Sequence, residues 1–398
     1  MTDVDAQLAE IMRGVADLKT PDDLRQKLAK GRPLRIKLGI DPTAKDLHLG
    51  FAVVLRKLRT FQDLGHQAVL IVGDYTAQVG DPSGRNQTRP ILTEAEVRAN
   101  AETFIAQIGQ IVDLERLEVR WNGEWFSKLS FLEVVRLCAR MTVARLLERD
   151  DFEKRMQKEL PVGLHELLYP VMQGYDSIMV EADVELGGTD QLFNLLVGRQ
   201  LQPAFDQEPQ VCLMTPLLVG TCGGRKMSKS YGNYVGIAEA PEEQYGKTMS
   251  IPDALMRDWF VHATSLATEE IDALLEGHPN QAKHRLAYEV ASCYHGTEGA
   301  EKARAHFQRT VVEKELPEDI PHYEVAEADL EEGRVWIVAL LASAFGKSRS
   351  DARRLIQQKA VSVDGDLVTD PHARFEPRDG QVVKAGKRNY AMLRVTAS

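Results

Sequence analysis

The stretch of residues 37–58 constrains the fold most, because it predicts the end of a strand, a turn and then a helix. Apolar side chains alternate over 34–40, as in a strand, and Asp41-Pro42-Thr43 has the composition of a turn. From about Asp46 the apolar residues recur at helical spacing. A helix start presents unpaired N–H groups and a partial positive charge, so this unit predicts an anion site with His48 beside it.

Glycines and lysines extend this prediction. Gly39 and Gly50 allow a phosphate to approach the backbone closely, but their spacing matches neither the dinucleotide fingerprint nor the P-loop. The segment 223–230, Gly-Gly-Arg-Lys-Met-Ser-Lys-Ser, offers Lys226 and Lys229 in a loop that can close over a polyphosphate. Alone, such a loop is usually solvated surface. Its combination with the helix start at His48 favours a phosphate site.

Apolar segments predict a parallel sheet. Residues 68–73 are wholly apolar, as in strands buried on both faces of such a sheet, and further strands are expected at 119–121 and 211–219. A strand, a helix and a strand in this order imply a right-handed crossover. The fold class is therefore α/β, with a doubly wound parallel nucleotide-binding sheet.

Helical patterns lie between these strands. Residues 1–31 have helical spacing that Pro21 ends, a capping box opens a helix at Thr93, and 131–148 has the pattern of one helix. The charged run 149–159 is interpreted as a solvated surface or connector. Residues 238–330 are rich in Glu, Ala and Leu and predict a helical region.

The distribution of charge points to a polyanionic partner. The chain of 398 residues carries a net charge of −10, and two or three domains are expected for this length. Residues 336–398 contain 11 Lys and Arg against 6 Asp and Glu, a net charge of +5, which leaves −15 for the rest. An acidic body with a basic module is typical of a protein that binds nucleic acid through that module.

Composition also limits the class of protein. The four cysteines form no Cys-x-x-Cys pair and have no zinc-site spacing, so we expect no metal site. The acidic amino terminus does not resemble a signal peptide, and no apolar run has membrane-spanning length. A cytoplasmic protein without a membrane segment is expected.

Four segments are expected along the chain. They are an N-terminal helical segment (1–31), a Rossmann-like catalytic domain with a connective insertion (32–237), a helical domain (238–330) and a small α+β domain (336–398). Residues 315–321 have the Pro and acid content of a linker. Residues 361–368 predict a hairpin with an Asp-Gly turn.

Several motifs occur together in one order. They are Asp-Pro-Thr-x-x-Asp-Leu-His-Leu-Gly at 41–50, Gly-Asp-Pro-Ser-Gly-Arg at 80–85, Gly-Gly-Thr-Asp-Gln at 187–191 and the lysine loop at 226–230. The helix start and the lysine loop resemble the two signatures of class I aminoacyl-tRNA synthetases. With the other motifs and the S4-like carboxyl-terminal segment, the chain resembles the bacterial tyrosyl-tRNA synthetases over nearly its whole length.

The resemblance implies an activity and partners. Tyrosine would react with ATP to give tyrosyl-adenylate and pyrophosphate, and the tyrosine would then pass to the 3′ end of tRNA(Tyr). Mg²⁺ would accompany the ATP phosphates, although the chain shows no carboxylate cage for it. Segment 238–330 would be the helical domain for the anticodon region of the tRNA. The last domain would be an S4-like RNA-binding domain. The family's members are homodimers across the nucleotide-binding domain, so a homodimer is expected.

The resemblance also assigns residues to the nucleotide. The catalytic residues around the β and γ phosphates would be Thr43, His48, Lys226 and Lys229. Further contacts with the nucleotide would come from Asp41, Gly50, Gly188, Asp190, Met227 and Ser228. Asp190 would accept from the ribose hydroxyls.

A second set would bind the amino acid: Lys37, Asp81, Tyr169, Gln173, Asp176 and Gln191. Tyr169, Gln173 and Asp176 are four and three residues apart, so on a helix they share one face. Tyr169, Gln173 and Asp81 would meet the ammonium group, and Asp176 would accept the phenolic proton. At the position of Lys37, some members of the family have a Tyr that recognises the phenol group of the substrate. The presence of Lys37 there leaves more of the selectivity to Asp176.

The basic residues of the last domain would contact RNA, and their other interpretation is a solvated surface. They are Lys347, Arg349, Arg353, Arg354 and Lys359. Shape and phosphate contacts to structured RNA would suit such a group.

One position departs from the family. Phe51 stands where the signature has a second His or sometimes Asn, and it cannot donate a hydrogen bond to the ribose. We expect weaker use of ATP but an active enzyme. Two alternatives remain: a catalytically impaired RNA-binding paralogue, for which Phe51 is the support, and the same chemistry on tryptophan. The spacing of Tyr169, Gln173 and Asp176 favours tyrosine.

Overall fold

The computed structural model describes residues 3–43, 46–83, 93–312, 320–326, 329–331, 333–386 and 389–395. The chain forms two compact units, residues 1–305 and 306–398. Each unit has its own core and is described by itself below. None of the described helices combines the length and the apolar character that crossing a bilayer requires.

A sheet of six described strands organises the first unit, in the order β1-β6-β5-β2-β3-β4. The strands are β1 (Asp17–Lys19), β2 (Arg35–Ile40), β3 (Gln67–Val72), β4 (Leu117–Trp121), β5 (Val184–Gly188) and β6 (Val211–Thr215). Strands β2 to β6 pair in parallel, and β1 joins the edge antiparallel to β6. The predicted doubly wound parallel sheet is confirmed, with an antiparallel edge strand added.

The expectation for residues 1–31 is partly wrong. This segment forms two helices, α1 (Val4–Met12) and α2 (Pro21–Ala29), with β1 between them. Pro21 begins α2 and does not end a helix, because the first turn of a helix needs no N–H from proline. Leu18 lies opposite Leu213 in the sheet, so its apolar side chain belongs to a strand pattern.

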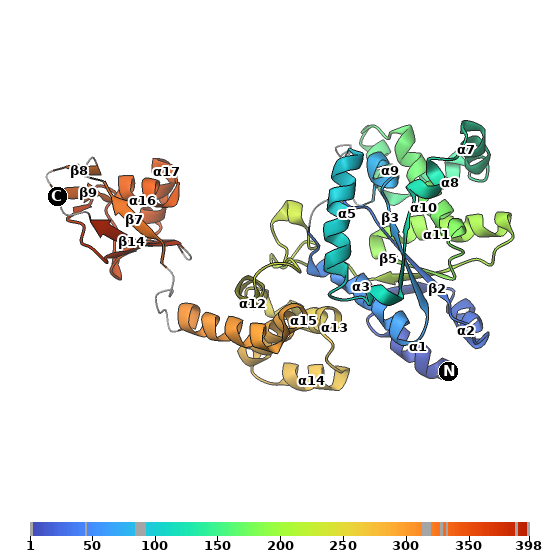
Figure 1. The fold of residues 1–398 in the computed structure, drawn as a ribbon, viewed down its shortest axis with the longest axis horizontal. Helices are drawn as coiled ribbons and strands as arrows, with labels where there is room; N and C mark the ends of the chain where they lie inside the picture. Colours follow the sequence, from blue (N-terminus) through green and yellow to red (C-terminus); the bar gives the residue numbers. More distant parts are fainter. Residues whose placement is uncertain are drawn as a thin grey trace. The chain divides into compact units, whose positions relative to one another are not determined.

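Helices cover both faces of this sheet (Figure 1). On one face lie α3 (Leu49–Asp63) and α5 (Glu94–Ile108), whose Phe61 and Phe104 pack in one core with Leu70 of β3. On the other lie α10 (Leu164–Met179) and α11 (Leu192–Leu201). The predicted capping box at Thr93 is confirmed at the start of α5.

The strand order places a switch point between β2 and β5. The chain proceeds from β2 to β3 and β4 on one side, whereas β5 is followed by β6 on the other side. Because the connections diverge, a crevice opens at the carboxyl ends of these two strands. The turn at 41–43 follows β2, and residues 189–191 follow β5, so both motifs lie at this crevice.

Two expectations for the region between β4 and α10 are wrong in part. The helix expected over 131–148 is broken into α7 (Phe131–Cys138) and α8 (Val143–Leu147), because the Thr142 side chain accepts from the backbone N–H of Arg145 and caps α8. The charged run forms α9 (Asp150–Gln157), and Arg149 and Arg155 are buried. The surface interpretation is therefore wrong for these two arginines.

Shorter elements complete the unit. They are α4 (Thr76–Val79), α6 (Gly123–Phe126) and the 3₁₀ turns Leu114–Arg116, Thr189–Gln191, Gln202–Phe205, Lys229–Tyr231 and Asp253–Leu255. The strand expected over 211–219 ends at Thr215, because Pro216 follows and cannot donate to a sheet.

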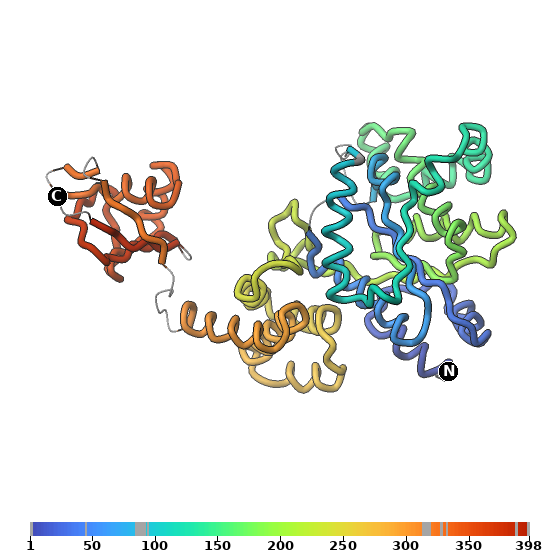
Figure 2. Tube along the Cα trace, in the orientation of Figure 1, coloured from blue at the N-terminus to red at the C-terminus, as the bar shows by residue number. Residues whose placement is uncertain are grey.

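Four helices follow the sheet, seen in yellow to orange in Figure 2. They are α12 (Pro241–Met249), α13 (Met256–Ala263), α14 (Thr268–Glu276) and α15 (Pro279–Phe307), which is interrupted at Gly296 with φ 69°. Trp259 and Leu286 share a core with Leu49 and Val53 of α3. This shared core explains why the helices expected from residue 238 belong to the same compact unit as the sheet.

The second unit begins with the last turn of α15 and a π-helical turn, Gln308–Val312. Its larger sheet has the order β11-β10-β13-β14-β7 and its smaller one β12-β9-β8. The bounds are β7 (His322–Val325), β8 (Leu330–Glu331), β9 (Arg334–Trp336), β10 (Val361–Val363), β11 (Asp366–Leu367), β12 (Arg374–Phe375), β13 (Val382–Ala385) and β14 (Asn389–Val395). Helices α16 (Ile337–Phe345) and α17 (Arg349–Gln357) pack on them.

Two expectations concern this unit. The hairpin at 361–368 is confirmed: Asp364 and Gly365 both have positive φ (49° and 89°) between β10 and β11. Residues 322–325, expected to be helical, form β7, which pairs in parallel with β14. Of the expected linker 315–321, residues 315–319 lie outside the described residues.

Candidate active site

A cavity of about 810 Å³ lies at the switch point between β2 and β5. The strands, the start of α3, helix α10 and the lysine loop all contribute to its walls. The expected nucleotide and amino-acid residues that line it are Asp41, Thr43, His48, Gly50, Asp81, Tyr169, Gln173, Asp176, Gly188, Asp190, Gln191, Lys226, Met227, Ser228 and Lys229. Lys37 does not line it.

His48 caps the helix that faces the cavity. Helix α3 begins at Leu49, three residues later than expected, and Nδ1 of His48 accepts from the backbone N–H of Gly50 (3.2 Å). Burial and the charges of Lys229 and Lys226 lower the pKa of His48 to about 4. The imidazole is therefore neutral at pH 7, and since Nδ1 accepts, the ring proton lies on Nε2.

The lysine loop reaches the same place. Lys226 Nζ lies 3.0 Å from Asp190 Oδ2, and Lys229 Nζ lies 3.5 Å from Asp46 Oδ2. Met227 between them is buried in the apolar cluster that includes Leu49 of α3. A buried methionine flanked by two ammonium groups therefore anchors the loop beside the start of α3.

The turn after β5 forms another wall. Gly188 ends β5, and a Cβ there would lie 2.8 Å from Asp190 Oδ1, so a larger residue would displace this carboxylate. Asp190 is half-buried and accepts from Lys226. Its second oxygen and the narrow glycine turn suit a ligand that donates hydroxyl groups.

Polar side chains cross-link the wall formed by α10. The hydroxyl of Tyr169 donates to Asp41 (2.8 Å), whose other oxygen accepts from Thr76 (2.8 Å). Gln191 donates to Asp81 (2.9 Å), which also accepts from the backbone N–H of Ser83 (2.8 Å). These bonds hold acceptor groups toward the cavity, where an ammonium group can bind.

Asp176 is the most buried carboxylate of the cavity. It accepts from the indole N–H of Trp125 (2.9 Å) and from the amide of Asn122 (3.3 Å). Burial raises the pKa of Asp176 to about 7, although Lys37 and these two hydrogen bonds lower it. A carboxylate so placed is a strong acceptor for a buried hydroxyl or N–H group.

Lys37 lies beneath the cavity, so it is placed differently from the substrate contact that the resemblance implies. Its side chain is fully buried, and Nζ donates to the carbonyl of Gln173 (2.7 Å), to Ser177 (2.8 Å) and to Glu185 (2.9 Å). These bonds use its three N–H donors. Direct contact with a ligand would require one of them to break.

Phe51 lies at the cavity mouth. It is 37% exposed, and its ring centroid lies 4.9 Å from that of His48. The ring offers a ligand an apolar surface and no hydrogen-bond donor at this position of α3.

Four residues around the cavity were not expected from the sequence. Asn122 and Trp125 hold Asp176. A signal for them exists, since Asn122 directly follows the parallel strand β4 at its carboxyl end and Trp125 lies in the short helix α6 after it. Arg149 donates to Ser83 (2.6 Å) and Asn194 (3.1 Å), and Asn194 donates to Gln173 (2.9 Å) and Gln191. Nothing in the charged run distinguishes Arg149 from its exposed neighbours.

The second unit carries the basic residues expected to contact RNA. The guanidinium groups of Arg349 and Arg353 lie over the ring of Trp336, at 5.8 and 5.7 Å. Arg354 pairs with Asp351 on another side of α17 (2.7 Å). Lys347 is half-buried before the helix, and Lys359 is exposed after it. The helix therefore presents its arginines on two sides, with two of them held by an aromatic ring.

Asp176 generates a prediction about stability. Its pKa is higher in the folded chain than the ordinary 3.8, so the folded state binds this proton more tightly. Stability is therefore lost as the pH rises from about 4 to about 7, by on the order of 4 kcal/mol. We expect Asp176→Asn to unfold at a higher temperature than the unsubstituted chain at pH 8, with a smaller difference at pH 5, in thermal unfolding scans.

Asp150→Asn is the control, because that side chain is 88% exposed and should change little at either pH. A lower unfolding temperature of Asp176→Asn at pH 8 would show that the buried carboxylate stabilises the fold, contrary to this prediction.

Comparisons with known proteins agree with this geometry. The family model described as tRNA synthetases class I (W and Y) matches residues 29–311, and the model described as S4 domain matches residues 335–383. The structure is also similar to tyrosyl-tRNA synthetase from Archaeoglobus fulgidus, solved in complex with L-tyrosine. That likeness has a TM-score of 0.63 at 23% identity and covers 76% of this chain and 100% of the other, which supports the fold.

Two bacterial relatives cover nearly the whole chain. Tyrosine-tRNA ligase from Moorella thermoacetica is 51% identical and covers 98% of this chain and 96% of its own. Tyrosine-tRNA ligase from Symbiobacterium thermophilum is 52% identical and covers 98% of both. The chain belongs to the tyrosyl-tRNA synthetase family of class I aminoacyl-tRNA synthetases.

Proposed function

We propose that this chain activates L-tyrosine with ATP and then transfers the tyrosine to the 3′ end of tRNA(Tyr). The observation that carries the proposal is one cavity in which a buried acceptor, Asp176, accompanies His48 and the two loop lysines. The relatives at about 50% identity are tyrosine-tRNA ligases, which supports the same substrate here.

In the first step, a carboxylate oxygen of tyrosine attacks the α-phosphorus of ATP. The bond from this phosphorus to the bridging oxygen breaks, and pyrophosphate leaves. The protein positions the reactants and stabilises the charge that develops on pyrophosphate. Lys226 and Lys229 supply ammonium groups, Thr43 supplies a hydroxyl, and the neutral His48 donates through Nε2.

Tyrosine is recognised at its two ends. Asp176 accepts the phenolic proton, while Asp81, Tyr169 and Gln173 surround the ammonium group, with Gln191 beside them. Phenylalanine would leave the buried acceptor without a partner, and tyrosyl-tRNA synthetases are themselves the standard example of such rejection.

The nucleotide occupies the wall that joins β2, β5 and α3. Asp190 accepts from the ribose, and the turn at Gly188 allows close approach. Asp41, Gly50, Met227 and Ser228 complete this wall. Lys226 then exchanges its ion pair with Asp190 for the phosphates. Mg²⁺ would enter as the magnesium complex of ATP, held by the phosphates.

In the second step, a ribose hydroxyl at the 3′ end of the tRNA attacks the carbonyl carbon of tyrosyl-adenylate, and AMP leaves. Residues 336–398 bind the tRNA as an S4-like domain, and the helical segment 238–330 serves the anticodon region. Residues 32–237 form the catalytic domain, which follows the N-terminal segment 1–31 in the chain. The RNA contacts come from the α17 surface: Lys347, Arg349, Arg353, Arg354 and Lys359. A cytoplasmic location suits these substrates.

A pyrophosphate exchange assay tests this function. With labelled pyrophosphate and ATP, tyrosine should support exchange, whereas phenylalanine and tryptophan should not. Lys229→Ala should lower kcat by about 10²–10³-fold, because it removes a charge that stabilises the transition state. Lys302→Ala, in an exposed ion pair with Glu298, is the control and should leave the rate unchanged.

The alternatives give different results in that assay. If only tryptophan supports exchange, the substrate is tryptophan and not tyrosine. Absence of exchange with any amino acid, with tRNA binding retained, would support the impaired paralogue. The convergence of His48, Lys226 and Lys229 on one cavity argues against that alternative.

Phe51 generates a second prediction. A missing neutral hydrogen bond costs about 0.5–1.5 kcal/mol, so Phe51→His should raise kcat/KM for ATP by about 2–10-fold. Steady-state exchange kinetics with varied ATP measure this effect. Phe51→Leu is the control, since it keeps an apolar side chain without a donor. Unchanged or lower kcat/KM in Phe51→His would count against a ribose contact at this position.

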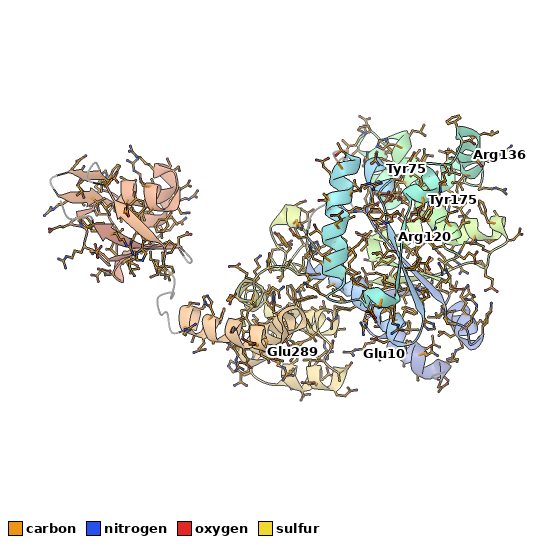
Figure 3. The ribbon with its side chains drawn as sticks, in the orientation of Figure 1. Glu10, Tyr75, Arg120, Arg136, Tyr175 and Glu289 are labelled. Atoms are coloured by element: carbon orange, nitrogen blue, oxygen red, sulfur yellow. The ribbon has the colours of Figure 1, made fainter. Side chains whose placement is uncertain are left out.

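We also propose that the chain forms a homodimer through the α7 face. This face consists of exposed apolar side chains of α7, α8 and α10: Phe131, Leu132, Val135, Val143 and Leu164. Phe131 is 83% exposed. Figure 3 labels Arg136, which also belongs to α7. Helices α7 and α8 both contact α10, and exposed apolar side chains gathered on neighbouring helices often mark a protein interface. The family resemblance also implies a homodimer.

The dimer predicts an effect of charge at this face. Phe131→Asp would place a carboxylate in the interface, so it should shift the mass measured by sedimentation from two chains to one. Leu114→Asp introduces the same charge at an exposed apolar residue elsewhere in the unit and should leave the mass unchanged. A Phe131→Asp variant that still sediments as two chains would refute this interface.

A further inference from the structure

We infer that Lys37 and Glu185, a wholly buried ion pair beneath the amino-acid pocket, position Asp176 and set how strongly its carboxylate accepts the phenolic proton. The inference rests on the proposed recognition of tyrosine by Asp176. It assigns Lys37 and Glu185 as positioning residues that act through α10, without contact with the substrate.

The pair is enclosed and hydrogen-bonded. Both side chains are 0% exposed, and Lys37 Nζ lies 2.9 Å from Glu185 Oε1. Lys37 also donates to Ser177 and to the carbonyl of Gln173. Glu185 accepts from the Gln173 amide (3.0 Å), from the Ser177 hydroxyl (3.1 Å) and from Gln210. Each charge therefore has several partners, which a buried ion pair needs to be tolerated.

Helix α11 leaves room for this arrangement. A Cβ on Gly198 would lie 2.6 Å from Gln210 Nε2, 3.0 Å from Ser177 Oγ and 3.3 Å from Glu185 Oε2. Glycine at this position thus lets α11 pack closely while the polar groups of Ser177, Glu185 and Gln210 meet beneath it. A larger residue would push these groups apart.

The contacts of the pair flank Asp176 along the helix. Gln173 precedes Asp176 by three residues and Ser177 follows it directly, so all three lie within five consecutive residues of α10. Lys37 belongs to β2 and Glu185 to β5, the two strands at the switch point. The pair therefore ties the turn that carries Asp176 to both strands.

The two charges act on Asp176 in opposite directions. Burial raises the pKa of Asp176, Lys37 lowers it, and Glu185 raises it further. From the segment after β4, Asn122 and Trp125 donate without charge. Cys212 of β6 lies near the pair and stays neutral, because burial raises the pKa of its thiol to about 12. Removal of the Lys37 charge should therefore raise the pKa of Asp176, and removal of the Glu185 charge should lower it.

The test measures kcat/KM for tyrosine against pH in pyrophosphate exchange, with the full chain. For the unsubstituted chain we expect an inflection near pH 7, from Asp176. Lys37→Met should move the inflection up by about one pH unit, and Glu185→Gln should move it down by about one unit. Lys37→Met should also lower the ratio of kcat/KM for tyrosine to that for phenylalanine. The ammonium group of tyrosine titrates identically in every variant.

A double variant guards against misfolding. Lys37→Met leaves Glu185 as a buried charge without its cation, and this variant can fail to fold. Lys37→Met with Glu185→Gln removes both charges, so it should fold, and its inflection should lie between those of the single variants. If a single variant is unfolded in a thermal scan, the double variant and the remaining single variant carry the test.

Arg155 and Glu166 offer a matched control, since their ion pair is also buried (4% and 4% exposed) and lies outside the cavity. Arg155→Met with Glu166→Gln should lower the unfolding temperature and leave the inflection in place.

Shifts of the same sign in both single variants, or inflections that coincide in all folded variants, would overturn the inference. Absence of exchange with tyrosine in the unsubstituted chain would instead refute the proposed function, so the two failures are distinguishable.

Discussion

Strands β2 and β5 pair in parallel at the centre of the sheet, and this pairing sets the position of the candidate active site. Ile36 and Leu38 lie opposite Val184 and Leu186, and the chain leaves the two strands in opposite directions. The crevice at their carboxyl ends therefore follows from strand order and not from any particular loop. Two motifs about 150 residues apart meet there, because 41–50 follows β2 and 187–191 ends β5.

The lysine loop joins this crevice through apolar packing. Met227 is buried in the cluster that contains Leu49 and Val53 of α3, and Trp259 donates to the carbonyl of Val219. Because this core also includes the helices after residue 240, the helical region supports the loop that closes the cavity. Burial and the positive charges of the loop together lower the pKa of His48 and keep its imidazole neutral.

Buried charge distinguishes the amino-acid end of the cavity. Lys37 and Glu185 neutralise one another, whereas Asp176 is held by uncharged donors and remains costly to ionise. A site that recognises a hydroxyl group in an apolar pocket needs such a hydrogen-bond acceptor. Its burial lowers the stability of the folded chain. The polar network from Arg149 through Asn194 to Gln173 joins this end to the residues around Asp81.

Local periodicity and turn chemistry were enough to predict the α/β class, the succession of strands in the sheet, the capping box at Thr93 and the hairpin at 361–368. The sequence motifs also identified most of the residues that line the cavity. The helix start at Pro21, the pairing of β1 with the sheet, and the burial of Arg149 and Lys37 could be seen only in the folded chain. Those outcomes depend on contacts between residues far apart in the chain, such as Leu18 with Leu213 and Lys37 with Glu185, and local pattern carries no information about such partners.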